Sequence, residues 1–184
     1  FGGISLVTFP TDVKGFKARK AEAATRGKLR GLGMSNTIER AAAASLEGAE
    51  VRFDRDGTVM LFSGANNQGQ GHQTAFTQIV CDRLGVDPKD TQYIQGDTDQ
   101  VFFGEGTGGS RSSAMAGSAF HLAAEKIITK ARAIAAHMLQ VQPDDLRYDE
   151  GVFSTSKTNR TLSMKELAAA ALEPKNLPKD MEAG

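Results

Sequence analysis

Residues 59–85 read VMLFSGANNQGQGHQTAFTQIVCDRLG, and this stretch decides the fold. It opens with an apolar segment that ends at Ser63, and a glycine-rich loop follows from Gly64 to Gly71. Beyond the loop, apolar residues recur at three- and four-residue spacing: Phe76, Ile79, Val80 and Leu84. That spacing is typical of an amphipathic helix, and Gly85 directly after it suits a helix C-terminal cap. The stretch predicts a strand, a loop and a helix in succession.

The segment before this stretch predicts a β-hairpin over Glu50–Ser63. Apolar and polar residues alternate on both sides of Arg55-Asp56-Gly57, a sequence with the composition of a tight turn. The apolar segment from Val59 is therefore the second strand of a hairpin.

A second succession of strand, loop and helix follows downstream. A short strand is predicted over Thr91–Gln95, and a second glycine-rich loop runs from Gly104 to Gly109. After the loop comes the longest helical pattern of the chain, in which apolar residues keep the helical period from Phe120 to Met138. The two glycine-rich loops thus occupy equivalent places, each between a strand and a helix.

The C-terminal part predicts two short strands, around Leu146–Tyr148 and Val152–Ser154. A last helix is predicted to open at Ser163, with Glu166 three residues later in the spacing of a capping box. The expected fold class is α/β (α+β): a mixed sheet with long amphipathic helices packed on it, as part of a larger domain.

The N-terminal part gives weaker signals. A modest helix is expected within Thr11–Thr25, and a strand interrupted by glycines is expected over Lys28–Ile38. We predict a lead-in segment over residues 1–25, a binding domain over 26–172 and a surface tail over 173–184. The absence of an initiator methionine and of a targeting pattern suggests a piece excised from a longer, cytoplasmic protein.

Composition excludes several classes of protein. The 22 basic residues balance the 22 acidic residues, so no overall positive charge favours nucleic acid or an anionic membrane. The chain has no long apolar run that could cross a membrane. Its one cysteine, Cys81, excludes a disulfide framework, and its place among apolar residues favours a packed thiol over a nucleophile. The unusual feature of the composition is glycine: the chain has 20, of which ten lie within Gly64–Gly117.

The two glycine-rich loops are the candidate binding elements. A helix N-terminus presents unpaired N–H groups and a partial positive charge, and glycine lets a ligand approach the backbone. In the first loop, Gln68 and Gln70 add amides that both donate and accept. The second loop adds hydroxyl donors and a guanidinium suited to phosphate oxygens, from Thr107, Ser110, Arg111, Ser112 and Ser113. Together the loops suggest one extended, dinucleotide-type ligand.

Simpler interpretations compete with this one. Glycine-rich turns before helices are common, and Gly104–Gly109 matches the dinucleotide-binding string G-x-G-x-x-G only literally, without its βαβ context. His72, in the first turn of a helix, either contacts a ligand or faces solvent. Glu105 resembles a catalytic carboxylate, but a flexible loop explains its position as well.

Three motifs taken together resemble a known family. They are Asn67-Gln68-Gly69-Gln70-Gly71-His72-Gln73-Thr74, Gln95-Gly96-Asp97-Thr98-Asp99 and Gly106-Thr107-Gly108-Gly109-Ser110-Arg111-Ser112. In this order they are similar to the molybdenum-binding large subunit of the xanthine dehydrogenase and aldehyde oxidase family, in its bacterial carbon monoxide dehydrogenase-like branch. The resemblance covers roughly residues 25–171.

The resemblance implies a molybdopterin cofactor, expected in its cytosine dinucleotide form. It implies cofactor contacts from the first loop through Gln68, Gly69, Gln70, Gly71 and His72, and from the second through Thr107, Ser110, Arg111 and Ser112. The implied reaction is oxidative hydroxylation of an aldehyde, an N-heterocycle or a similar small molecule, with water as the oxygen source.

The resemblance also implies what lies elsewhere. The family's glutamate base has no counterpart in this chain, so no catalytic residue and no metal ligand is expected here. The expected partners are the remainder of the large subunit and units that carry FAD and iron–sulfur clusters. Two alternatives stay open: a non-catalytic, stand-alone binding or assembly module with the same fold, and an ordinary nucleotide-binding enzyme that uses Gly104–Gly109.

Overall fold

The computed structural model describes residues 15–33, 41, 46–179 and 181–182, and the chain divides into two compact units, residues 1–40 and 41–184. In the first unit, helix α1 spans Phe16–Thr25, as the sequence predicts. The predicted strand over Lys28–Ile38 is wrong where the structure describes it, because residues 28–33 have no regular secondary structure. The rest of that segment, and residues 1–14, lie outside the described residues.

The second unit is built on a mixed three-stranded sheet of β1 (Ala49–Phe53), β2 (Val59–Ser63) and β3 (Thr91–Gln95). Strands β1 and β2 form the predicted antiparallel hairpin. Strand β3 returns parallel to β2, with Ser63 opposite Gln95 at the carboxyl ends. Helix α2 (His72–Leu84) makes the connection between them, so β2, α2 and β3 form a βαβ unit.

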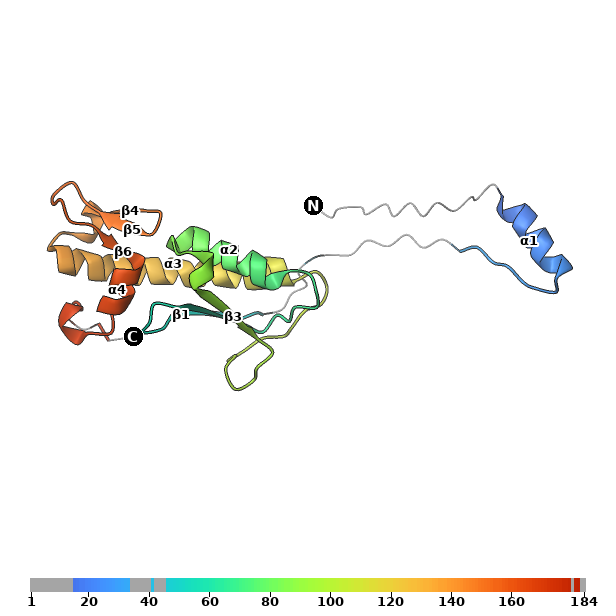
Figure 1. Cartoon of the computed structure of the whole chain (residues 1–184), viewed down its shortest axis with the longest axis horizontal. Helices are drawn as coiled ribbons and strands as arrows, with labels where there is room; N and C mark the ends of the chain where they lie inside the picture. Colours follow the sequence, from blue (N-terminus) through green and yellow to red (C-terminus); the bar gives the residue numbers. More distant parts are fainter. Residues whose placement is uncertain (1–14, 34–40, 42–45, 180, 183–184) are drawn as a thin grey trace. The chain divides into compact units, whose positions relative to one another are not determined.

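Helix α3 (Ser112–Leu139) is the longest element and runs past both α2 and β1 (Figure 1). Its buried residues recur at the helical period that the sequence shows, and Phe120 packs on Phe76 of α2 with ring centroids 5.1 Å apart. The core of the unit lies between these helices and the inner face of β2, where Val59 and Leu61 are fully buried. Each helix is thus amphipathic, and its apolar side is buried in this core.

A second, smaller sheet packs at the far end of α3. It consists of β4 (Arg147–Asp149), β5 (Val152–Ser154) and β6 (Leu162–Ser163), all antiparallel. Helix α4 (Met164–Ala170) follows, and the predicted capping box is present, with Ser163 as the N-cap and Glu166 bonded back to it. Short 3-10 turns occur at Pro88–Asp90, Pro143–Asp145 and Pro174–Asn176.

The expected α/β class, with helices packed on a mixed sheet, is confirmed. The predicted domain boundaries stay a prediction, although the compact units divide at residues 40 and 41. The C-terminal segment does not lie wholly on the surface as predicted, because Leu177 is buried in the core. Among the described residues, no helix is both long enough and apolar enough to span a bilayer.

Candidate functional site

Both glycine-rich loops begin at the same edge of the sheet. Because β2 and β3 are parallel, their carboxyl ends lie side by side, and the chain leaves both ends in the same direction. Open α/β sheets bind ligands outside this edge. Two hydrogen bonds join the segments there: the Thr107 hydroxyl donates to the Asn66 carbonyl at 2.7 Å, and the Asn67 N–H donates to Gln95 Oε1 at 2.7 Å.

The backbones of the two loops cross at Gly64 and Gly104. A Cβ added to either glycine would lie 2.3 Å from the Cα of the other, a distance that no side chain permits. The Glu47 carboxylate lies beside the crossing, 2.9 Å from such a Cβ on Gly64 and 2.7 Å from one on Gly104. These two glycines therefore serve a close approach of two backbones, and the crossing fixes the separation of the loops.

Residues 68–71 of the first loop are exposed, and the polar groups of the loop bond to one another. The Gln68 N–H donates to Gln70 Oε1 at 2.5 Å, while the Gln70 amide donates to Gln68 Oε1 and to the Asn66 carbonyl. Asn67 Oδ1 accepts from the N–H groups of Gly69 and Gly71 at 3.2 and 3.1 Å. The loop is preformed by these bonds, and the two glutamine side chains lie on its solvent-facing side.

The start of α2 leaves donors for a ligand. Gly71 is the N-cap residue and has no side chain that could bond to the first N–H groups of the helix. The partial positive charge of the helix N-terminus adds to these donors and favours an anionic group. The first loop can thus hold a phosphate or another anion without a basic side chain.

His72 does not face solvent, which corrects one of the two predicted alternatives. Its side chain is buried, its ring stacks at 5.1 Å on Phe76, and its Nδ1 lies 3.3 Å from the Ala65 carbonyl. A carbonyl only accepts, so Nδ1 is the donor. The Tyr93 hydroxyl donates to the same carbonyl at 3.2 Å, so both side chains fix the beginning of the loop.

Arg111 is buried, so the prediction of a guanidinium that is free to bind phosphate oxygens is wrong. Its Nη1 donates to Glu47 Oε2 at 2.8 Å and to the Gly106 carbonyl at 2.6 Å, and its Nη2 donates to the Leu46 carbonyl. Glu105, 3.6 Å from the same guanidinium, is its second carboxylate partner. Because the side chains of Arg111 and Glu47 are 8% and 1% exposed, this is a buried ion pair that shapes the second loop.

The other predicted residues of the second loop lie at the start of α3. The Ser112 hydroxyl is buried and donates to the Thr107 hydroxyl at 3.2 Å, which in turn bonds to the first loop. Ser110 is exposed and takes a left-handed conformation, with φ of 52°. Thr107 and Ser112 thus join the two loops, while Ser110 stands at the surface next to them.

A pocket of about 340 Å³ lies where these segments meet. Both loops and the turn after β3 line it, through Gly64, Asn66, Gly96, Asp97, Thr98, Val101, Gly104, Glu105 and Gly106. The Gln100 amide and the Asp99 N–H bond to the Asp97 carboxylate and lower its pKa, so Asp97 is charged at neutral pH. The pocket therefore carries the negative charge of Asp97, which disfavours an anionic ligand group inside it.

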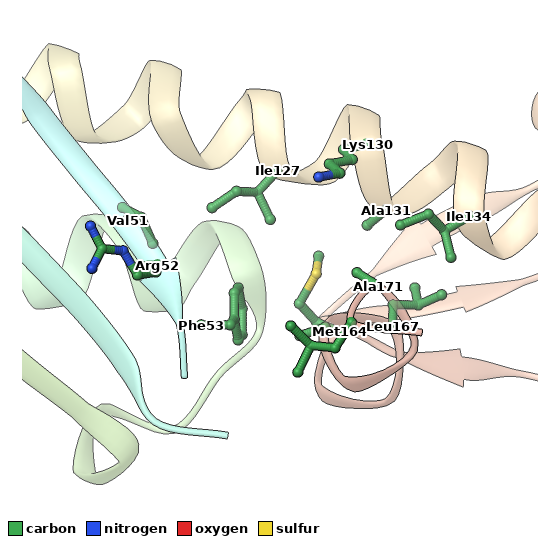
Figure 2. Close-up of a pocket in the computed structure, with 12 residues that line it drawn as sticks. Val51, Arg52, Phe53, Ile127, Lys130, Ala131, Ile134, Met164, Leu167 and Ala171 are labelled. Carbon is green, nitrogen blue, oxygen red and sulfur yellow. The ribbon is translucent and has the colours of Figure 1, made fainter. Parts of the chain in front are cut away.

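A second, apolar pocket of about 180 Å³ lies away from the loops, between β1, α3 and α4 (Figure 2). Phe53, Ile127, Ile134, Met164 and Leu167 line it. Its lining is mostly apolar, with Arg52 and Lys130 as the charged members, and none of its residues belongs to the two loops, so it is not part of the candidate site.

The one cysteine of the chain is a packed side chain. Cys81 is buried as predicted, and burial raises the pKa of its thiol to about 11, which keeps it protonated and unreactive. Across the residues that the structure describes, no group of three or more His, Cys, Asp or Glu side chains could hold a metal ion.

Sequence reasoning missed Asn67, Gln95, Glu47 and Tyr93. Asn67 had a local signal, since asparagine commonly bonds to backbone N–H groups a few residues ahead. The other three act across 28 or more residues of chain, and no local pattern reveals such contacts.

The sequence matches a known family over most of its length. The family model described as "Molybdopterin cofactor-binding domain" matches residues 10–182. The carbon monoxide dehydrogenase large chain of Afipia carboxidovorans is 39% identical over 156 residues, which are 83% of this chain and 19% of that protein. A putative xanthine dehydrogenase molybdenum-binding subunit of Escherichia coli is 35% identical over 129 residues, 68% of this chain and 17% of that protein.

The fold is shared as well. The reconstituted CO dehydrogenase from Oligotropha carboxidovorans superposes with a TM-score of 0.74 and 34% identity, over 94% of this chain and 23% of that one. The chain thus spans about a fifth of the length of the curated relatives it matches. Because the family model matches nearly its whole length, the chain belongs to the molybdopterin cofactor-binding domain family. The carbon monoxide dehydrogenase large chain and the xanthine dehydrogenase molybdenum-binding subunit are its relatives.

Proposed function

We propose that this chain forms one wall of the cofactor cleft in the large subunit of a molybdenum hydroxylase. The observation that carries the proposal is the junction of two glycine-rich loops at the carboxyl ends of the parallel strands β2 and β3. This edge of an α/β sheet is where extended ligands bind, and each loop leads into the N-terminus of a helix.

The residues present fit a molybdopterin cofactor. Its phosphates require N–H donors, which the start of α2 provides behind an N-cap glycine. Its heterocycles require groups that both donate and accept, which Gln68 and Gln70 provide on the exposed side of the first loop. The carboxylates of Asp97 and Glu105 line the pocket and disfavour phosphate there, so the phosphates are expected at the helix starts.

The cofactor-binding residues that we propose are those of the two loops. In the first loop, Gln68 and Gln70 hold the cofactor by their amides, Gly69 and Gly71 allow close approach, and His72 supports the loop from below. In the second, Ser110 supplies an exposed hydroxyl group, Thr107 and Ser112 act through the bonds that join the two loops, and Arg111 acts through the ion pair that shapes the loop. When bound, the cofactor supplies a molybdenum centre for oxidative hydroxylation with water as the oxygen source.

The finer assignments are also proposals. We expect the cytosine dinucleotide form of the cofactor, and an aldehyde, an N-heterocycle or a similar small molecule as substrate. The expected partners are the remainder of the large subunit and units with FAD and iron–sulfur clusters, in a cytoplasmic complex. By itself the chain is expected to be inactive, because the resemblance puts the catalytic base in another part of the subunit.

The test is cofactor retention in the full-length gene product that contains the chain. Changing both Gln68 and Gln70 to alanine should lower the molybdenum and pterin content of the purified protein several-fold, since the two amides proposed as contacts are lost together with the bonds by which they shape the loop. Gln78, exposed on α2 and away from the loop, is the matched control, and Gln78→Ala should retain the cofactor.

Two outcomes would contradict the proposal. Unchanged pterin content in the double variant would remove the glutamines from the site. A well-folded full-length protein that carries neither molybdenum nor pterin would favour the alternative of a non-catalytic assembly module. Release of CMP on acid hydrolysis tests the cytosine dinucleotide form separately.

A further inference from the structure

We propose that Asn67 and Gln95 are positioning residues of the cofactor loop, an inference that rests on the proposed function. Neither residue needs to touch the cofactor. Together they connect the rigid sheet to the exposed loop, so that Gln68, Gln70 and the start of α2 are held ready for the ligand.

The connection begins in the sheet. Gln95 is the last residue of β3 and lies opposite Ser63 in the parallel ladder, so its backbone position is set by two strands. Its side-chain Oε1 accepts from the Asn67 N–H at 2.7 Å, across 28 residues of chain. This bond fixes Asn67 relative to the sheet.

The connection continues through the Asn67 side chain. Its Oδ1 accepts from both Gly69 and Gly71, at 3.2 and 3.1 Å, and so bridges the loop to the N-cap of α2. These glycines have φ values of 106° and 80°, which other residues rarely adopt. Asn67 Oδ1 thus fixes the peptide N–H groups of both Gly69 and Gly71. These glycines are the positions where the loop could most easily change its conformation.

Packing does not hold this part of the loop. A Cβ added to Gly69 or Gly71 would meet no atom within 4 Å, and residues 68–71 are exposed. The shape of the loop therefore depends on hydrogen bonds from Asn67, Gln70 and Gln95. Preorganisation of a binding loop lowers the entropy that the ligand must overcome on binding, so loss of these bonds should weaken retention of the cofactor.

The same bonds decide which donors remain for the ligand. Because Asn67 occupies the N–H groups of Gly69 and Gly71, and Gln70 occupies that of Gln68, the loop turns these donors inward. The first N–H groups of α2, which no side chain caps, then stay available at the helix N-terminus. Asn67 thus orients the donors of the helix without contacting the anion.

The test uses four variants of the full-length gene product. Asn67→Ala removes the acceptor, and Gln95→Met removes the acceptor of Gln95 while keeping the length of its side chain. Asn67→Ser keeps an oxygen that can bond to the N–H two residues ahead. Asn159→Ala is the matched control, because Asn159 is exposed in the connection between β5 and β6.

The readouts are pterin per protein, the midpoint of thermal unfolding, and hydrogen exchange of peptides that span residues 64–75. Asn67→Ala and Gln95→Met should each lower pterin content by about fivefold or more, as expected for one or two lost hydrogen bonds. Exchange in the loop should rise in both, with an unchanged unfolding midpoint. Asn67→Ser should restore much of the pterin, and Asn159→Ala should match the unmodified protein.

The contrary results are distinct. Full pterin retention in Asn67→Ala and Gln95→Met overturns the positioning role. Pterin loss in Asn67→Ala and Asn67→Ser alike, with an equal fall in the unfolding midpoint, shows a general role in folding and also overturns it. Absence of pterin from the unmodified protein, by contrast, is a failure of the proposed function itself.

Discussion

At the scale of single residues, Arg111 shows how burial changes the chemistry of a side chain. An arginine beside a glycine-rich loop suggests a phosphate ligand, but here Glu47 and two backbone carbonyls take up donors of the guanidinium. A buried charge without a partner costs several kcal/mol of folding free energy, so Arg111 and Glu47 each need the other to stay buried as ions. Arg111 shapes the second loop from beneath, and a direct contact with cofactor stays a prediction.

Arg111→Ala should destabilise the protein by about 3–5 kcal/mol, because Glu47 would be left buried without its partner. Urea unfolding of the purified protein measures this change. The double variant Arg111→Met with Glu47→Leu should recover roughly half of the loss, since it removes both charges. If the double variant is no more stable than Arg111→Ala, the buried charge is not the cause.

The double variant also separates the two roles of Arg111. If its stability recovers while its pterin content stays low, Arg111 serves cofactor binding beyond stability, by direct contact or through the bonds that shape the loop. Recovery of both quantities assigns it the structural role alone.

At the scale of secondary structure, elements with complete local signals follow the sequence closely. The β1–β2 hairpin has alternation and a turn, α2 has a helical period and Gly85 as its cap, and α4 has a capping box. The predicted strand at Lys28 has apolar residues without regular alternation, and in the described residues 28–33 no strand forms. A strand needs a partner, and a local pattern does not provide one.

Ser163→Ala should destabilise the protein by about 1 kcal/mol, the usual cost of losing an N-cap side chain. The Ser163 hydroxyl donates to Glu166 and, with the Ser163 N–H, lowers the pKa of that carboxyl. A carboxyl whose pKa is lower when folded stabilises the protein above its unfolded pKa, and this stabilisation is lost as pH falls. The cost of Ser163→Ala should therefore be largest near neutral pH and smaller in acid.

Thermal unfolding of both proteins between pH 3 and pH 7 checks this expectation. Ser156→Ala, at an exposed position without a capping role, is the control and should change stability little at any pH. A cost of Ser163→Ala that stays constant over the whole range would rule out the contribution of Glu166.

At the scale of the whole second unit, the site depends on the direction of one strand. Because β3 runs parallel to β2, the strand ends Ser63 and Gln95, 32 residues apart in sequence, lie at the same edge of the sheet, and the segments with the two loops leave from there. The crossing of Gly64 and Gly104 then brings the backbones together. Thr107 and Gln95 complete the junction by hydrogen bonds to the first loop.

Gly64→Ala should destabilise the protein by about 2 kcal/mol or more, because the new Cβ would meet the backbone of Gly104. The same change should lower pterin content in the full-length protein, since the loops are forced apart. Gly108→Ala is the matched control for stability, because a Cβ there would meet nothing within 4 Å. Equal stability of the two variants would show that the crossing tolerates a side chain.

The sequence by itself determined the local elements, the two glycine-rich loops, the buried state of Cys81 and the family to which the chain belongs. These depend on periodicity, capping residues and motif order, all of which act over a few residues. The parallel pairing of β3, the Glu47–Arg111 ion pair and the burial of His72 were decided only by the tertiary structure. Each of them joins groups that are distant in sequence or depends on what covers a side chain, and only the packed chain brings such groups together.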